Sequence, residues 1–301
     1  MTTFTSAGSA GLWIQGSRPR TLALSVTPIA VGLVYASVTF GAVAAVPILA
    51  ALLSAVLIQV ATNLANDAAD GDKGADHVER LGPVRLVGSG LAPAFLVRRG
   101  AVAASLGAVV FGLIAVLHGG MPILLIGVGS LVAAWCYSYG PWPISTGPFG
   151  EVFVILFFGI IATIGIVWLG ALQVDGTAVL LGLAIGMPAA AVLTVNNHRD
   201  RAQDEAAGRR TLAIVLGPEA TPYLYVIELA AGALITGLAL WPISWLGVVV
   251  AAVAFGFALY LGHRLSRTPI SRVMNGMLAA TVRFQLGLAA GIIVVLLLGA
   301  R

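Results

Sequence analysis

Long apolar runs, interrupted only by short polar or Pro/Gly-rich segments, are the feature that most limits what this chain can fold into. The runs give nine candidate spans of about 20 residues, which is the length of helix that crosses the hydrocarbon core of a bilayer. Because the runs are continuous rather than alternating, they predict helices and not the strands of a membrane barrel. The nine spans cover residues 21–40, 42–64, 97–117, 121–139, 150–170, 177–197, 220–240, 242–262 and 277–299.

The composition agrees with a lipid environment. Only 9% of the residues are charged, whereas about a quarter are charged in a soluble globular domain. The mean hydropathy is +1.01. The net charge of +4 does not indicate nucleic-acid binding, because the basic residues lie in short segments between the spans. We therefore expect residues 1–301 to form a single integral-membrane domain.

The distribution of Lys and Arg tests the number of spans independently. With the N-terminus in the cytoplasm, 14 of the 16 Lys and Arg residues fall on the cytoplasmic side. The opposite loops, around residues 41, 118–121, 172–177 and 241, carry none. Cytoplasmic loops of membrane proteins are enriched in these residues. The sequence thus predicts an all-α polytopic membrane protein with nine transmembrane helices, its N-terminus in the cytoplasm and its C-terminus outside.

Most of the acidic residues lie in two long cytoplasmic loops, residues 65–96 and 198–219. In the first loop, if the second span continues through Asp70, the side chains of Asn63, Asn66, Asp67 and Asp70 form one helical stripe. Carboxylates crowded on one face repel each other unless a cation lies among them. Carboxylate and amide oxygens are ligands that suit Mg²⁺, which usually also binds substrate phosphates.

The second loop repeats this pattern. Asn197, Asp200 and Asp204 share one helix face, and arginines are interleaved with them at positions 199, 201, 209 and 210. Acids mixed with arginines indicate a cation and an anion bound together, as in a complex of Mg²⁺ with a diphosphate. One such cluster could be an ordinary solvated loop. Two matching stripes, in a chain with only 12 acidic residues, favour a functional site.

These motifs carry a resemblance to a known family. Asn66-Asp67-Ala-Ala-Asp70, together with Asp200-x-x-x-Asp204, resembles the two aspartate-rich motifs of the UbiA-type intramembrane prenyltransferases. Residues 63–76, 137–143, 196–200 and 208–212 are similar to the branch of that family that prenylates 1,4-dihydroxy-2-naphthoate in menaquinone synthesis. The general motif places an acid four residues after Asp70, where this chain has Gly74. The naphthoate branch places it two residues later, at Asp76.

The resemblance implies a fold, a reaction and a location. The fold is nine helices around a central cavity in the cell membrane, with the active site facing the cytoplasm. The reaction is the Mg²⁺-dependent transfer of a polyprenyl group from polyprenyl diphosphate to 1,4-dihydroxy-2-naphthoate, with decarboxylation. The expected metal-binding residues are Asn66, Asp67, Asp70, Asp76, Asn197, Asp200 and Asp204.

Further residues receive expected roles in binding the substrates. Lys73, Arg201 and Arg209 would neutralise the leaving diphosphate. The ring of Tyr139 would stabilise the allylic cation that forms from the prenyl group. The remaining candidates for the substrate site are Arg20, which would hold the naphthoate carboxylate, with Asn63 and Glu151.

Two alternatives stay open at this point. The chain could transfer a prenyl group to another acceptor, such as hydroxybenzoate, homogentisate or a phosphoribosyl compound. It could also be an ion-coupled secondary transporter. A transporter would be expected to carry acids at mid-bilayer and matched helices broken by Gly or Pro, whereas the acids here gather at the ends of spans.

Overall fold

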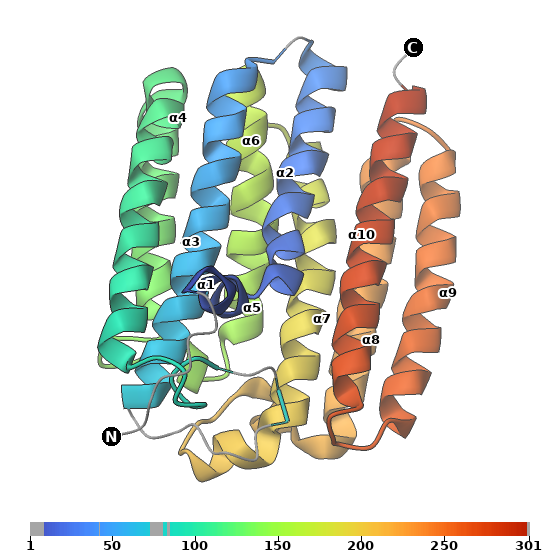
Figure 1. The fold of residues 1–301 in the computed structure, drawn as a ribbon. Helices are drawn as coiled ribbons and strands as arrows, with labels where there is room; N and C mark the ends of the chain where they lie inside the picture. Colours follow the sequence, from blue (N-terminus) through green and yellow to red (C-terminus); the bar gives the residue numbers. More distant parts are fainter. Residues whose placement is uncertain (1–8, 42, 73–80, 83–84, 300–301) are drawn as a thin grey trace.

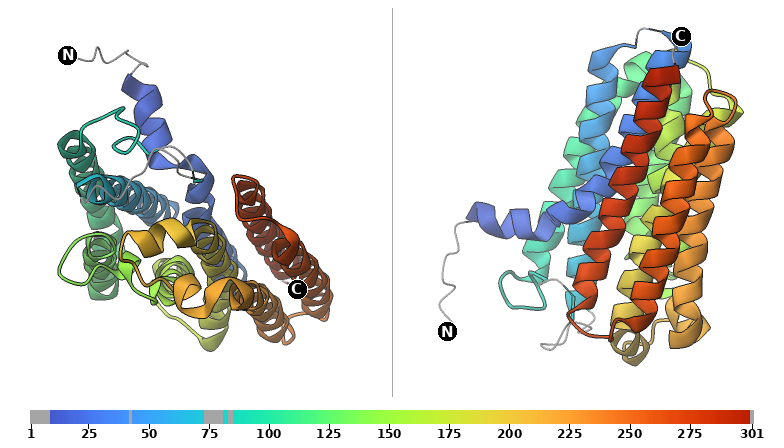
Figure 2. Two further views of the ribbon diagram at one scale, coloured as in Figure 1. Left: turned by 90° about the horizontal axis from the view of Figure 1, so that it is seen from below. Right: turned by 90° about the vertical axis from the view of Figure 1, so that its right-hand side faces the viewer.

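The computed structural model describes residues 9–41, 43–72, 81–82 and 85–299, and it forms one upright bundle of helices (Figure 1). A short helix, α1 (Ser9–Ser17), projects outward from the side of the bundle, as Figure 2 shows. The prediction of an all-α fold is confirmed. The other helical segments are α2 (Pro19–Phe40), α3 (Ala45–Asp72), α4 (Ala94–Cys136), η1 (Ile144–Thr146), α5 (Gly150–Ile155), η2 (Leu156–Ile161), α6 (Ala162–Ala171), α7 (Gly176–Ala206), α8 (Leu212–Leu240), α9 (Leu246–Arg267) and α10 (Met274–Gly299).

Eight helical stretches in the described part of the chain are long and apolar enough to cross a membrane. The π-helix η2 joins α5 and α6 into one of these stretches, Gly150–Ala171. Several large apolar side chains on α9, among them Val253, Phe257 and Tyr260, are exposed on the surface of the bundle. Lipid tails cover such side chains as well as protein would, which agrees with a protein that crosses a membrane several times.

The longest helix, α4, is a folded-back pair. Its 43 residues would extend about 65 Å if straight, which is twice the hydrocarbon thickness of a bilayer. The backbone turns at Gly120, where φ is 67° and ψ is −151°. The indole of Trp135 donates a hydrogen bond to the Ser105 hydroxyl over 3.2 Å, although these residues would be about 45 Å apart in a straight helix. The turn falls between the predicted spans 97–117 and 121–139.

Helix α7 is the most buried of the long helices. Within its most apolar stretch of 18 residues, 72% are buried inside the bundle. It approaches η2 very closely, because Gly159, Gly182 and Gly186 meet there without side chains. A Cβ on Gly159 would lie 2.5 Å from the carbonyl oxygen of Gly182 and 2.6 Å from the Cα of Gly186. Small residues allow helices in membranes to pack backbone against backbone. This contact fixes the stretch that begins with α5 against α7.

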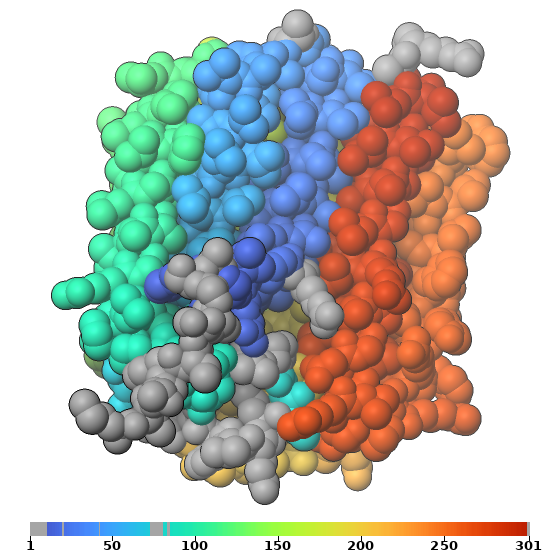
Figure 3. Space-filling model, viewed as in Figure 1, coloured from blue at the N-terminus to red at the C-terminus, as the bar shows by residue number. Residues whose placement is uncertain are grey.

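The helices that carry the two acidic stripes end at the same end of the bundle, the lower end in Figure 1. Helix α3 continues through Asp70 to Asp72, as predicted, and α7 continues to Ala206. Both stripes are therefore helical. Figure 3 shows α3, α2 and α10 following one another across one face of the bundle, with α1 in front of them. The two acidic stripes therefore lie at the lower end of the bundle.

Candidate active site

A single arginine connects the two acidic motifs. The guanidinium of Arg209 pairs with Asp70 on α3, and its Nη1 lies 3.2 Å from Oδ1 of Asp204 on α7. The Asp70 side chain is only 5% exposed. An ion pair so far removed from water is much less screened than a surface pair. The predicted convergence of the two motifs therefore exists in the structure, and Arg209 lies between them.

Arg85 is a second cation at Asp70, and no local pattern in the sequence distinguishes it from the other arginines of the loops. It is buried, pairs with Asp70 and donates a 3.1 Å hydrogen bond to Oδ1 of Asn66. Burial, followed by the nearby charges of Arg18 and Arg209, lowers the pKa of Arg85 to about 9. The guanidinium of Arg85 is thus held close to another cation, an arrangement that suits the binding of a multiply charged anion.

Asp67 fixes the backbone segment that carries Arg85. Its carboxylate is 2% exposed and accepts backbone hydrogen bonds from Leu86 at 2.7 Å and from Val87 at 3.2 Å. Because these two residues directly follow Arg85, the contact fixes the segment against α3. Both oxygens of Asp67 are therefore engaged with backbone N–H groups, although the sequence predicted a metal ligand at this position.

On α7, the predicted residues are held by neighbours on other helices and on α7 itself. Asn197 donates a 2.9 Å hydrogen bond to Oε1 of Glu151, at the start of α5. The other carboxyl oxygen of Glu151 is buried and has no hydrogen-bond partner among the described residues. Arg199 donates one hydrogen bond to each carboxylate oxygen of Asp200, both at 2.7 Å. Glu151 thus lies beside the second motif, as expected.

The tyrosine beside these groups is Tyr137 rather than Tyr139. The ring of Tyr137 is 5.6 Å from that of Phe153, which in turn is 4.5 Å from Phe157. Tyr137 lies close enough to Glu151 for the two groups to interact electrostatically. Tyr139 instead packs on Trp135 in a separate apolar cluster with α1. The two side chains leave the same turn in different directions.

The other predicted residues are distributed around this centre. Asn63 donates to the Ser17 carbonyl oxygen over 2.9 Å and so fastens α1 to α3. The Nε of Arg201 is buried without a partner in the described part of the chain. Asp72 forms an exposed pair with Arg98 at 2.8 Å. Lys73, Asp76 and the side chain of Arg20 lie outside the described residues.

The carboxylate and amide oxygens of the two motifs suit Mg²⁺, provided that the arginines that now pair with them bind another anion. In the described residues, no three His, Cys, Asp or Glu side chains converge on one point. The carboxylates of Asp70 and Asp204 nevertheless share the Arg209 guanidinium, and Asn66 adds an amide oxygen beside Asp70 through Arg85. Mg²⁺ needs only one or two carboxylates when phosphates and water complete its shell. The residues present therefore fit a Mg²⁺–phosphate complex better than a fully protein-ligated metal.

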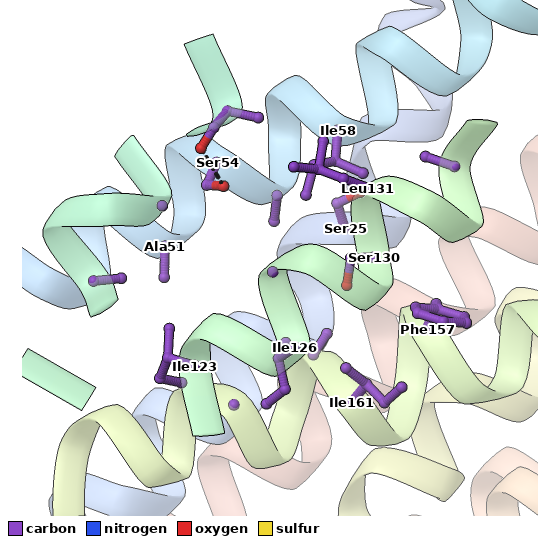
Figure 4. Close-up of a pocket in the computed structure, with 18 of the residues that line it drawn as sticks. Ser25, Ala51, Ser54, Ile58, Ile123, Ile126, Ser130, Leu131, Phe157 and Ile161 are labelled. Carbon is purple, nitrogen blue, oxygen red and sulfur yellow. Dashed lines mark hydrogen bonds between the residues drawn. The ribbon is translucent and has the colours of Figure 1, made fainter. Parts of the chain in front are cut away.

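An apolar cavity of ≈ 210 Å³ lies within the bundle, between α2, α3, both arms of α4 and the stretch from α5 to α6. Figure 4 shows Ile58, Ile126, Phe157 and Ile161 among its lining side chains. Phe153 also lines it and contacts Tyr137, so the cavity reaches the aromatic edge of the charged site. The lining is almost entirely hydrocarbon, with Ser25 and Gln59 hydrogen-bonded to each other at 3.0 Å.

Comparisons with known proteins agree on the family. The sequence profile of the UbiA prenyltransferase family matches residues 25–297. A 1,4-dihydroxy-2-naphthoate octaprenyltransferase of Mycobacterium leprae is 36% identical over 240 residues, covering 80% of this chain and 81% of that protein. The enzyme of the same name from Escherichia coli is 30% identical and covers 92% and 94%. The fold is similar to that of a UbiA homologue from Archaeoglobus fulgidus bound to DMAPP and Mg²⁺, with a TM-score of 0.69, 15% identity, and 95% and 99% coverage.

Proposed function

Because the chain belongs to the UbiA prenyltransferase family, we propose that it transfers a polyprenyl group from polyprenyl diphosphate to 1,4-dihydroxy-2-naphthoate. The ring carboxylate leaves as CO₂, and the product is a demethylmenaquinone in its reduced form. One observation carries the proposal: a cluster of acids and arginines lies at the aromatic edge of an apolar cavity. The names of the relatives from Mycobacterium leprae and Escherichia coli support the naphthoate acceptor.

The charged end of the donor would bind between α3 and α7. Mg²⁺ would be held by Asp70 and Asp204 with Asn66, and by the predicted ligands Asp76, Asn197 and Asp200, and it would supply positive charge to the leaving diphosphate. Arg85 and Arg209 occupy Asp70 in the structure. With these carboxylates holding the metal, the two arginines would bind diphosphate oxygens through charge-assisted hydrogen bonds.

The prenyl tail would lie in the apolar cavity. A hydrocarbon lining binds the tail and keeps water away from an allylic cation, which would otherwise be hydrolysed. The ring of Tyr137, stacked near Phe153, is placed where the tail would meet the diphosphate, and a ring face stabilises a cation. This assigns to Tyr137 the role that the sequence predicted for Tyr139.

The acceptor would bind beside Glu151. A free carboxyl oxygen of this residue is buried without a partner in the described part of the chain, so it can accept a hydrogen bond from a hydroxyl group of the naphthoate. The proposed partner for the naphthoate carboxylate remains Arg20. Bond formation between the ring and the prenyl carbon, with departure of diphosphate and CO₂, balances without any oxidant or reductant.

The same proposal includes the topology. Nine spans, with the N-terminus in the cytoplasm, the C-terminus outside and the site facing the cytoplasm of the cell membrane, are supported by the turn at Gly120 and by the distribution of Lys and Arg.

An assay of membranes tests the function directly. Membranes that contain the protein are incubated with 1,4-dihydroxy-2-naphthoate, Mg²⁺ and a panel of prenyl diphosphates, and the products are identified by mass. We expect a prenylated naphthol that has lost the carboxylate, and none when Mg²⁺ is chelated. A product formed only with hydroxybenzoate, or no product with any donor, would contradict the proposal.

A further inference from the structure

Arg199 is an arginine buried completely at the second acidic motif. Its side chain is 0% exposed, and its Nε and Nη2 hold the two carboxylate oxygens of Asp200 at 2.7 Å. Nη2 also donates to Oδ1 of Asn196 on the same helix, again over 2.7 Å. A guanidinium without access to water needs an acceptor for its N–H groups, because an unpaired buried donor is costly. The acceptor for Nη1 must come from another element.

That acceptor is Asn275, in the first turn of α10. Its Oδ1 receives the Nη1 hydrogen bond of Arg199 at 2.7 Å. The other end of the same amide, Nδ2, donates to the backbone carbonyl oxygen of Leu81 over 3.0 Å. Asn275 is therefore a two-sided connector. One side contacts the arginine that orients Asp200, and the other contacts the loop that follows α3.

Leu81 belongs to the part of the sequence that also holds Arg85. Leu81 precedes Arg85 by four residues, and Arg85 pairs with Asp70 and Asn66. A chain of contacts thus runs from Asp200 through Arg199 and Asn275 to the Leu81 backbone. It is separate from the direct bridge that Arg209 makes between the two motifs. Only Asn275 in this route lies in neither motif nor in either acidic loop.

We infer that Asn275 is a positioning residue: it orients Arg199, and through Arg199 the carboxylate of Asp200, for binding of the metal–diphosphate complex. The reaction it serves rests on the function proposed above. A neighbour that orients a metal ligand typically changes metal affinity by 10–100-fold when it is removed. Loss of Asn275 leaves Nη1 of Arg199 without its acceptor. The guanidinium of Arg199 and the Asp200 carboxylate that it binds then lose their fixed orientation.

Metal binding by the purified full-length protein tests the inference. Mn²⁺ replaces Mg²⁺ as the probe, inorganic diphosphate is present throughout, and free Mn²⁺ is measured by electron paramagnetic resonance. We expect Asn275→Ala to weaken Mn²⁺ binding about tenfold. Asn275→Asp keeps an oxygen that accepts from Arg199, but it replaces the donor to Leu81 by a second acceptor and adds a negative charge beside the guanidinium. Because the Arg199 contact is kept, it should stay closer to the wild type than Asn275→Ala.

The control is Ser266→Ala, which removes an exposed 2.9 Å hydrogen bond to the His263 carbonyl oxygen near the end of α9 and should bind Mn²⁺ like the wild type. If Asn275→Ala does not purify folded, Asn275→Ser, which is too short to reach Arg199, replaces it with the same expectation. Binding by Asn275→Ala equal to the wild type, or by Asn275→Asp as weak as by Asn275→Ala, overturns the inference. A wild type that binds Mn²⁺ with diphosphate but makes no prenylated naphthol contradicts the proposed function instead.

Discussion

At the scale of single residues, Asp70 is the centre of the site. Two arginines pair with it, and one of these also reaches Asp204 on the other motif. In the proposed reaction, a group with this many charged neighbours would affect the binding of both the metal and the diphosphate. Its oxygens would have to change partners, from guanidinium groups to the metal, when substrate arrives.

We therefore expect Asp70→Asn or Asp204→Asn to lower Mg²⁺-dependent transfer by about a hundredfold or more, the scale on which charge-stabilising groups act in active sites. The matched control is Asp72→Asn, because Asp72 lies two residues from Asp70 but forms an exposed pair with Arg98. It should retain nearly full activity. The transfer activities are compared as initial rates of the purified variants, at equal amounts of folded protein. Near-normal turnover by either Asp70→Asn or Asp204→Asn would rule out the two-motif site.

Tyr137 and Tyr139 show why a local sequence pattern is not enough to place a single side chain. Tyr137 and Tyr139 lie in the same short turn, and the pattern gave no helical period that could say which ring faces the acids. The structure stacks Tyr137 near Phe153 and Tyr139 on Trp135. Arg85 was missed for a related reason. Its partners Asn66 and Asp70 are reached only because Asp67 folds the following backbone onto α3, and no local spacing encodes that contact.

At the scale of elements, the contact of η2 with α7 positions Glu151 beside Asn197. It depends on glycines, since an added Cβ on Gly159 would collide with backbone atoms that cannot move aside.

Gly159→Ala should therefore destabilise the protein by about 1–3 kcal/mol, the usual cost of overpacking, and it should lower activity by shifting α5 relative to α7. Gly165→Ala is the matched control on α6, because its Cβ would meet only a side-chain methyl of Ile126, at an ordinary 3.5 Å. Thermal unfolding in detergent compares the two. Equal midpoints for both variants would mean that the close approach is not needed.

The long helices themselves were predictable from the apolar runs, which reflect the bilayer directly. The predicted extension of the second span through Asp70 is confirmed by α3, which ends at Asp72. The short helix α1 was not predicted, because it is too short to cross a membrane. The π-helical turns of η2 also leave no simple period in the apolar pattern. Membrane solvation decides where helices lie, while packing between helices decides such local departures.

At the scale of the whole molecule, the proposed topology places the loop between α6 and α7 outside the cell and the end of α7 in the cytoplasm. Single cysteines can test this in a chain whose one native cysteine, Cys136, is replaced by serine. Val174 and Ala207 are exposed at these two places.

A membrane-impermeant maleimide should label Val174→Cys in intact cells and Ala207→Cys only after the membrane is opened. The parent Cys136→Ser protein, which should not be labelled, is the control. The opposite pattern would reverse the orientation, and labelling of both positions in intact cells would contradict the number of spans between them.

The pairing of Asp70 with two arginines also bears on how the protein returns to its ligand-free state after each turnover. In the proposed reaction, once the prenyl group has left, inorganic diphosphate would compete for Arg85 and Arg209 with a carboxylate that is attached to the same protein and never diffuses away. Such a tethered competitor has a high effective concentration. The protein itself would therefore assist the release of diphosphate, and the free protein would return to a state in which its buried charges neutralise one another.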